Sequence, residues 1–147
     1  MAAGAWTFYN IAKKKLADGT MDLDTNTFRM SLYTSASNAA TVTLSTRTSV
    51  TSEVTEANGY SSSGKALTGV TWAAGASAKV FRWNAAALVW TAAGGSIGPI
   101  KFAVIWQATG VADKLVCFSQ LSTAAFSVTT GNTLTVTPSA SGIFELV

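Results

Sequence analysis

The sequence predicts an all-β protein, a jelly-roll-like β-sandwich preceded by a short N-terminal arm or helix. From residue 66 onward, segments rich in Val, Thr, Ile and aromatic residues recur about every ten residues, a spacing typical of sandwiches and jelly rolls. Near the N-terminus, apolar residues recur at the spacing of a helix. From residue 27 onward they alternate with polar residues, as in a strand. The 147 residues fit one domain, which we divide into an arm or helix over residues 1–19 and a sandwich over residues 20–147.

The N-terminal segment predicts a helix over residues 5–17. Ala5, Ala12 and Leu16 recur at helical spacing, together with Phe8 or Tyr9. The lysines that follow occupy the predicted last turns, where they complement the helix dipole, and a glycine at position 19 provides a stop signal.

The first predicted strand spans residues 28–33. Apolar side chains at positions 28, 30 and 32 alternate with residues that include Arg29 and Ser31, the pattern of a half-buried strand. Residues 41–44 are expected to add a short edge strand. Residues 45–65 are polar and rich in Ser and Thr, so we expect a long surface loop with a turn at Asn58-Gly59.

The remaining predicted strands span residues 66–72, 79–83, 87–91, 100–107, 114–120, 125–129, 133–137 and 143–147. In the segment 133–137, Leu134 and Val136 are expected to point inward between threonines. Residues 102–106 are apolar on both faces, which predicts a central strand covered on both sides. Pro99 is expected at the start of that strand, where its missing N–H costs least.

The composition favours a structural protein that works in a permanent assembly. Charged residues make up only 12% of the chain and hydrophobic residues 48%, so the charged share is about half the usual one. A thinly charged surface rich in Thr and Ala suits lasting contact with partners better than life as a free monomer.

Nucleic acid and membranes are not expected partners. The net charge of +3 is scattered, apart from the run of lysines at positions 13 to 15, which we interpret as the solvated end of a helix. The apolar first residues precede these lysines, the reverse of the order in a secretory signal. No stretch approaches the about 20 uninterrupted apolar residues of a membrane span.

Catalysis is not expected either. Histidine is absent, and Cys117 is the single cysteine. These counts exclude histidine-based nucleophile pairs, a disulfide within the chain and a cysteine-based zinc site. We therefore expect no enzyme activity and no catalytic, cofactor-binding or metal-binding residues. Cys117 lies in an apolar run and is expected to be buried.

Two weaker patterns are interpreted as structural. Residues 59–66 nearly spell a phosphate-binding loop, but Ala66 stands where a hydroxyl residue is needed and a strand-like segment follows instead of a helix. Asp18, Asp22 and Asp24 lack the order of a calcium-binding loop. We expect Asp18 and Asp22 to flank a turn that Asp24 and the nearby asparagine cap.

The tryptophans leave one functional alternative open. Trp72, Trp90 and Trp106 lie in apolar strand segments and are predicted to be core residues. Trp83, between Arg82 and Asn84, is the tryptophan most open to exposure. If these rings were exposed together, they would form a stacking platform for sugars, so a glycan-binding β-sandwich module stays an alternative.

Several segments, taken in order, resemble the pattern of a family of small virion proteins of tailed bacteriophages. They are Lys13–Asn38, Glu53–Tyr60, Leu67–Thr71, Val89–Ile100 and Gly142–Leu146. The resemblance implies a capsid decoration (cement) protein that binds the assembled shell of the major capsid protein and stabilises it. It also implies a place on the capsid exterior after assembly in the host cytoplasm, as a homo-oligomer or in multiple copies on the lattice.

The candidate capsid contact is the aromatic N-terminal arm. Trp6, Phe8, Tyr9 and Ile11 are the proposed anchor because aromatic side chains dominate interface energetics, and the contact is completed by the lysines that follow, Lys13, Lys14 and Lys15. Packing of the arm onto its own domain stays an alternative. A phage tail or fibre-associated protein is the alternative location.

Overall fold

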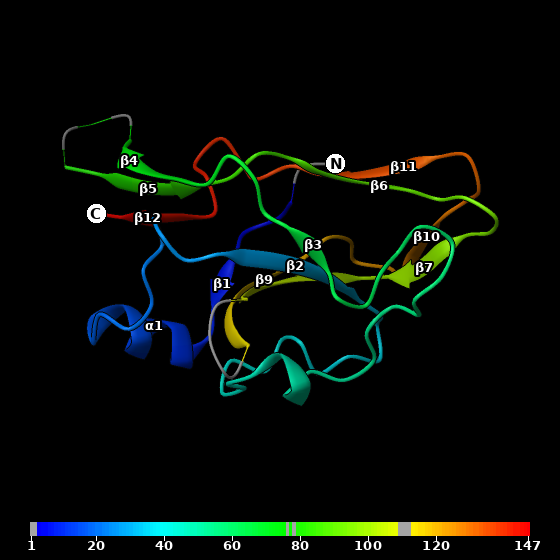
Figure 1. Ribbon diagram of the computed structural model, residues 1–147, viewed down its shortest axis with the longest axis horizontal. Helices are drawn as coiled ribbons and strands as arrows, with labels where there is room; N and C mark the ends of the chain where they lie inside the picture. Colours follow the sequence, from blue (N-terminus) through cyan, green and yellow to red (C-terminus); the bar gives the residue numbers. More distant parts are fainter. Residues whose placement is uncertain (1–2, 76, 78, 109–112) are drawn as a thin grey trace.

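The computed structural model describes residues 3–75, 77, 79–108 and 113–147. These residues form a mostly β protein with several antiparallel sheets and one short N-terminal helix. Three layers are visible in Figure 1: a five-stranded sheet lies between an upper layer of further strands and a lower layer made of the helix and a long loop. Within the described part of the chain, no helix has the length and apolar character needed to span a bilayer.

The five-stranded sheet has the order β1-β9-β8-β2-β3. Its strands are β1 (Thr7–Phe8), β9 (Lys114–Gln120), β8 (Phe102–Gln107), β2 (Phe28–Tyr33) and β3 (Lys65–Ala66). The helix α1 (Asn10–Ala17) follows β1 directly, and a 3₁₀ turn, η1 (Arg47–Ser49), lies in the long loop of the lower layer.

The other strands form three smaller antiparallel sheets. The upper layer holds β12 (Phe144–Leu146), β5 (Phe81–Asn84) and β4 (Thr71–Ala74) in that order, and a pair formed by β11 (Thr133–Val136) and β6 (Leu88–Thr91). The third sheet pairs β10 (Phe126–Val128) with β7 (Ile97–Ile100). Only Lys101 separates β7 from β8, and β10 follows β9 in the chain. The β7–β10 pair is therefore an extension of the β8–β9 pair.

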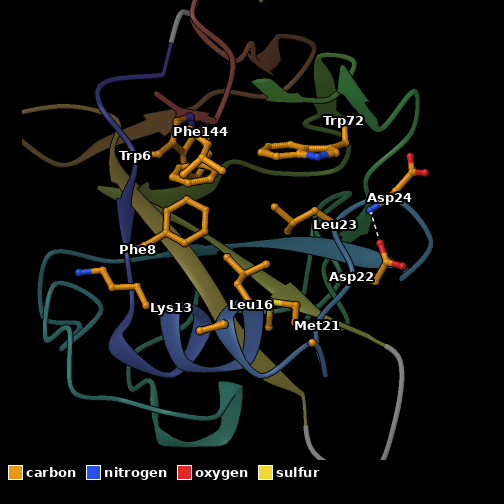
Figure 2. A pocket seen from close by; sticks show the side chains of 13 residues that line it. Trp6, Phe8, Lys13, Leu16, Met21, Asp22, Leu23, Asp24, Trp72 and Phe144 are labelled. Atoms are coloured by element: carbon orange, nitrogen blue, oxygen red, sulfur yellow. Dashed lines mark hydrogen bonds between the residues drawn. The ribbon is translucent and has the colours of Figure 1, made fainter. Parts of the chain in front are cut away.

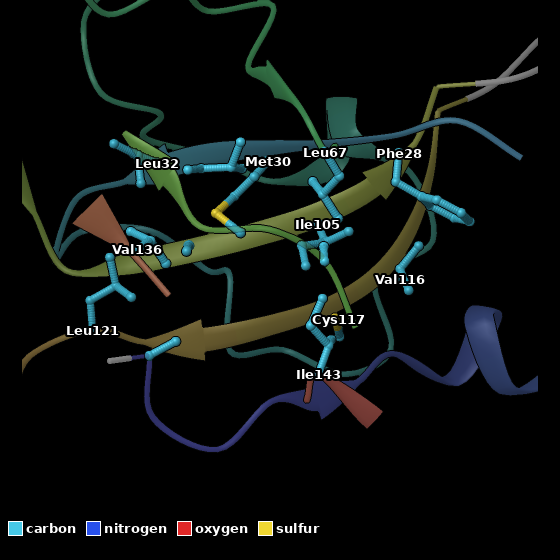
Figure 3. Packing of buried hydrophobic residues seen from close by; sticks show 14 of the residues in the cluster. Phe28, Met30, Leu32, Leu67, Ile105, Val116, Cys117, Leu121, Val136 and Ile143 are labelled. Carbon is cyan, nitrogen blue, oxygen red and sulfur yellow. The ribbon is translucent and has the colours of Figure 1, made fainter. Parts of the chain in front are cut away.

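Strand β8 is buried on both faces, which confirms the predicted central strand. It pairs with β2 on one side and with β9 on the other. Ala103 and Ile105 belong to the apolar core between the sheet and the upper layer, whereas Phe102, Val104 and Trp106 belong to a second core between the sheet and the lower layer. Figure 3 shows the first core, with side chains from distant segments: Phe28, Met30, Leu32, Ile105, Val116, Cys117, Val136 and Ile143.

A polar network holds the long loop over the second core. The Arg47 guanidinium lies 4.8 Å from the Trp106 ring centroid and forms an ion pair with Glu53 at 3.1 Å. The Tyr60 hydroxyl donates to the other Glu53 oxygen at 2.7 Å and accepts the backbone N–H of Leu32 at 3.0 Å. The loop predicted at residues 45–65 is therefore a fixed cover whose buried side chains include Val50 and Tyr60.

The predicted strands match the structure best where the segment forms a clear apolar run or alternates clearly. The segment 114–120 coincides with β9, and Leu134 and Val136 point inward as predicted. The segment 66–72 is divided between β3 and β4, because Gly69 between them adopts a φ of +57° that interrupts the extended backbone. Residues 41–44 form turns and not the expected edge strand.

Two further expectations were wrong. The helix predicted over residues 5–17 begins only at Asn10, because Thr7 and Phe8 pair with Phe118 and Cys117 as strand β1. At these two residues, backbone pairing with β9 determines the conformation, although the apolar residues have helical spacing. Pro99 lies inside β7, not at the start of the central strand.

Trp83, whose burial the sequence left open, is fully buried. Its ring contacts Phe28 edge-on at 5.0 Å, and its Nε1 donates to the Leu23 carbonyl at 2.9 Å. That bond satisfies the one polar atom of the indole, which allows the side chain to be buried between polar neighbours in the sequence.

The N-terminal segment contributes to both cores of the sheets. Phe8 and Ala12 belong to the core beneath the upper layer, whereas Tyr9 belongs to the second core. Residues on both sides of position 19 therefore bury apolar surface against the same strands.

We predict that Trp106→Ala lowers the free energy of unfolding by about 3–5 kcal/mol, because it empties a buried indole site in the central strand. The Trp106 Nε1 bond to Ser31 Oγ at 3.1 Å and the Arg47 contact are lost as well. Urea unfolding measures this loss, with Val89→Ala, at a side chain 40% exposed on β6, as the control. Equal midpoints for Trp106→Ala and the parent would contradict the placement of β8.

Candidate functional site

The candidate site is an apolar groove of about 820 Å³ between the upper layer and α1. Figure 2 shows its roof and floor: Trp6, Trp72 and Phe144 lie on the upper side, whereas Leu16 and Met21 lie on the lower side. Aromatic and aliphatic side chains thus face one another across an open space. We call this space the groove.

The roof follows from the alternation of three paired strands. Trp72 of β4 and Phe144 of β12 are both paired with Trp83 of β5, so the three side chains share one face. Trp83 is buried in the core and fixes the sheet, while Trp72 and Phe144 extend the same face over the groove. Their rings are nearly parallel, at 9° and 6.1 Å between centroids, and Phe8 contacts Phe144 at 4.7 Å.

The opposite face of this sheet is polar. Arg82 and Glu145, paired across β5 and β12, form an ion pair at 2.6 Å. The sheet therefore has the apolar and polar faces expected of an antiparallel sheet with one covered side.

The floor is made by α1 and the turn after it. Asp18 caps the C-terminus of the helix, where Gly19 adopts a φ of +73° that ends it. The Thr20 hydroxyl and N–H donate to the Asp18 carboxylate at 2.5 and 3.1 Å, and these bonds, with Lys14, lower the pKa of Asp18 to about 2. The capped turn carries the chain back beneath the roof, with Met21 facing the groove.

Opposite charges lie at the two ends of the groove. Lys13 lies at one end, and Asp22 and Asp24 lie at the other (Figure 2). The Thr25 hydroxyl and the backbone N–H groups of Asp24 and Thr25 donate to Asp22 and hold the pKa of its carboxyl below its ordinary value. Among the described residues, neither Lys13 nor Asp24 has an ion-pair partner, whereas Lys14 and Lys15 both pair with Asp18.

Two exposed apolar side chains lie at the edge of the groove: Leu146 is one of its lining residues, and Phe81 lies beside it. Phe81 is 45% exposed and Leu146 is 56% exposed. They are directly paired across β5 and β12 and lie on the same face as Trp83. The Phe81 ring stacks on Trp72 at 5.9 Å, which joins it to the roof. We call Phe81 and Leu146 the strip.

The proposed contact residues are divided between groove and core. Trp6 lines the groove, and its shielded Nε1 has no acceptor among the described residues. Phe8 is buried and contacts the groove from inside. Tyr9 is fully buried, and its hydroxyl, which burial keeps protonated by raising its pKa, donates to the Ala39 carbonyl at 2.5 Å. Ile11 packs against the second core.

The three lysines have different surroundings. Lys13 is exposed at the groove, whereas Lys14 and Lys15 lie within 3.2 and 3.9 Å of the Asp18 carboxylate. The sequence run therefore does not form one uniform basic patch, because two of its charges are already paired at the helix end.

Sequence reasoning missed the strip and, apart from Trp6, the roof. Trp72 was assigned to the core, and Phe81, Phe144 and Leu146 were not singled out. Their alternation with Arg82 and Glu145 was the available signal for one apolar face. That signal does not reveal whether the face is covered.

The acidic turn has nearly the predicted form. Asp18 and Asp22 accept local backbone N–H groups, as expected of turn residues. The cap comes from Asp22 and Asn26, since Asn26 Oδ1 accepts the Asp22 N–H at 2.9 Å, rather than from Asp24. Residues 59–64 are a loop that leads into β3, with Arg29 donating to the carbonyls of Ser63 and Gly64 at 2.6 and 2.8 Å.

Comparisons of the chain with protein-family models, with curated proteins and with solved structures found no match.

We predict that Tyr9→Ala strongly lowers stability, because it empties a fully buried site and leaves the Ala39 carbonyl without its donor. The expected loss of unfolding free energy is about 3–5 kcal/mol. Lys14→Ala, four residues from Asp18 on the exposed side of α1, serves as the control and should change stability by less than about 1 kcal/mol. An unchanged melting temperature for Tyr9→Ala would mean that the arm is not part of the core.

Proposed function

We propose that this protein is a structural component of a tailed-phage particle, a decoration or cement protein that binds the assembled shell of the major capsid protein. The main support for this proposal is the open apolar surface formed by the groove and the strip. It is continuous with the core and has few charges. Such surfaces on otherwise folded domains mark sites that a partner covers.

The sequence supports the same proposal. The segments that resemble small virion proteins of tailed phages include Leu67–Thr71 and Gly142–Leu146. These segments flank or form β4 and β12, the outer strands of the groove's roof. Two of the segments that resemble the phage proteins therefore contribute to the apolar surface.

We further propose that the layers form a jelly-roll-like sandwich. Support comes from two long antiparallel arrangements: β7 and β8 run beside β9 and β10, and β5 and β6 run beside β11 and β12. A rigid sandwich of this kind holds the groove and strip in fixed positions while its opposite faces remain available to neighbouring subunits.

Binding to the shell would depend on buried apolar area and on repetition. The low charge provides little long-range attraction, so affinity comes from covering rings such as Phe81 and Trp72. On a repeated lattice, modest single contacts are multiplied when each copy or oligomer touches more than one site. The protein would then stabilise the shell by linking neighbouring subunits on the exterior of the capsid.

Sedimentation with shells assembled from the major capsid protein tests this proposal. We expect the protein to sediment with the shells and to remain bound in about 1 M salt, where the Debye length falls to about 3 Å. Phe81→Ser should weaken retention, and Val89→Ser, a comparably exposed apolar residue on β6, should not. Retention that disappears in high salt would instead assign the contact to the lysines of α1.

Copy number in purified particles separates the head from the tail. Quantitative mass spectrometry should find hundreds of copies per particle, as a capsid lattice requires. A few to a few dozen copies would place the protein in the tail or a fibre. A glycan platform is less favoured, because Trp83, Trp90 and Trp106 are buried and only Trp72 of the predicted set is partly exposed.

A further inference from the structure

We propose that the Asn58-Gly59 turn is a site of spontaneous deamidation, that docking of the turn onto the loop between β6 and β7 holds it unreactive, and that the modified turn docks poorly. The two residues do not line the groove, so the proposal is independent of the proposed function. It concerns a covalent change that the chain carries out on itself and that consumes only water.

The reaction joins two groups that are neighbours in the chain. The backbone nitrogen of Gly59, after losing its proton to base, attacks Cγ of Asn58. A bond forms between that nitrogen and Cγ, the Cγ–Nδ2 bond breaks, and ammonia leaves behind a five-membered imide ring. Water then opens the ring at either carbonyl and yields aspartate or isoaspartate. Glycine favours the attack because no side chain shields its nitrogen, and the 147 residues contain one Asn-Gly pair.

The turn is held in place by its backbone and by the amide of Asn58. Asn58 and Gly59 have φ values of +58° and +96°, the left-handed backbone of a type I′ turn. The Asn58 carbonyl accepts the N–H of Ala93 at 3.0 Å, and Asn58 Nδ2 donates to the carbonyl of Ser96 at 2.9 Å. Two hydrogen bonds thus fix the main chain and the side chain of the reactive residue.

The fit against the β6–β7 loop requires glycine on both sides. A Cβ added to Gly59 would overlap the Thr91 carbonyl oxygen, and a Cβ added to Gly95 would lie 2.6 Å from Asn58 Nδ2. Neither distance is possible without movement of the backbone or of the amide. Docking therefore needs Gly59, the same residue that makes the preceding asparagine reactive.

The docked geometry opposes ring closure. A planar imide needs Cβ of Asn58 and the nitrogen of Gly59 on the same side of the Cα–C bond, and a type I′ turn places them on opposite sides. Rotation about this bond turns the Asn58 carbonyl away from Ala93, and the accompanying side-chain rotation removes Nδ2 from Ser96. The turn must open before it reacts, so the rate in the native protein follows the fraction of time that the turn is open.

The products fit the docking site worse than asparagine does. A carboxylate has no proton to donate, so oxygen faces oxygen where Nδ2 met the Ser96 carbonyl. Isoaspartate also adds one carbon to the main chain, which moves Gly59 against Thr91. Each opening that ends in deamidation therefore loosens the long loop in one direction only.

Tryptic peptide mapping of the full-length protein by mass spectrometry tests the proposal. The peptide of residues 48–65 contains Asn58 and no other asparagine or glutamine, so a gain of one mass unit reports this reaction. At mildly alkaline pH, we expect the folded protein to gain it at least about tenfold more slowly than protein unfolded in urea. Equal rates overturn the proposal, and so does an unfolded chain in which Asn58 stays intact.

Gly95→Ala separates docking from chemistry. The added methyl group displaces the Asn58 amide and leaves the Asn-Gly pair unchanged, and the backbone of Gly95 is not left-handed, so alanine is allowed there. We expect deamidation several-fold faster than in the parent when folded and equal to the parent in urea. A melting temperature shows that the variant is folded, and a parent-like rate in that folded variant overturns the protective role of docking.

Asn58→Asp imitates one product and tests whether the modified turn docks. Hydrogen exchange over residues 53–60 should be about tenfold faster than in the parent. Asn132→Asp is the matched control, because it adds the same charge at a turn where the Thr129 hydroxyl, now 2.8 Å from Asn132 Nδ2, can donate to a carboxylate. Exchange over residues 53–60 that Asn58→Asp leaves unchanged overturns the claim that the product docks poorly.

Discussion

The structure depends on one constraint: the central strand β8 is apolar on both faces, so each face must be covered. The upper layer covers Ala103 and Ile105, and the long loop with the start of α1 covers Val104 and Trp106. In a sheet that is covered on both sides, neither row of side chains is solvated, so both rows must pack against other parts of the protein. This requirement explains why a polar, Ser-rich loop is held down by the buried Tyr60 and the partly buried Arg47.

Sequence patterns predicted the central sheet well, because its strands alternate or are apolar throughout. The segment that became β9 coincides with its prediction, and Phe28 and Met30 of β2 are buried as expected. Ser31 and Tyr33 on the other face of β2 are buried too, so the prediction of a half-buried strand was wrong. The pattern failed where backbone pairing decided the outcome. Phe8 has helical spacing to Ala12, yet it pairs with Cys117 as a strand. Local periodicity carries no information about a partner strand more than a hundred residues away.

The groove was harder to predict than the fold, because it forms where the domain leaves an apolar sheet face uncovered. Trp72, Phe144 and Leu146 belong to strands that are distant in sequence and become neighbours only through β5. Their apolar character predicts an inward face, and it predicts the same whether the domain covers that face or leaves it open. Burial of Trp83 and exposure of Phe81, two positions apart on one strand, show that the cover ends within a single strand.

Cys117 has a use that follows from its position. It is fully buried in the first core, and burial raises the pKa of its thiol well above the ordinary value. A thiol that is both inaccessible and protonated reacts with alkylating reagents only when the sheet opens. The chain has no other cysteine. The rate at which Cys117 is alkylated therefore reports how often the domain opens, and mass spectrometry can follow this rate even when the protein is attached to a large particle.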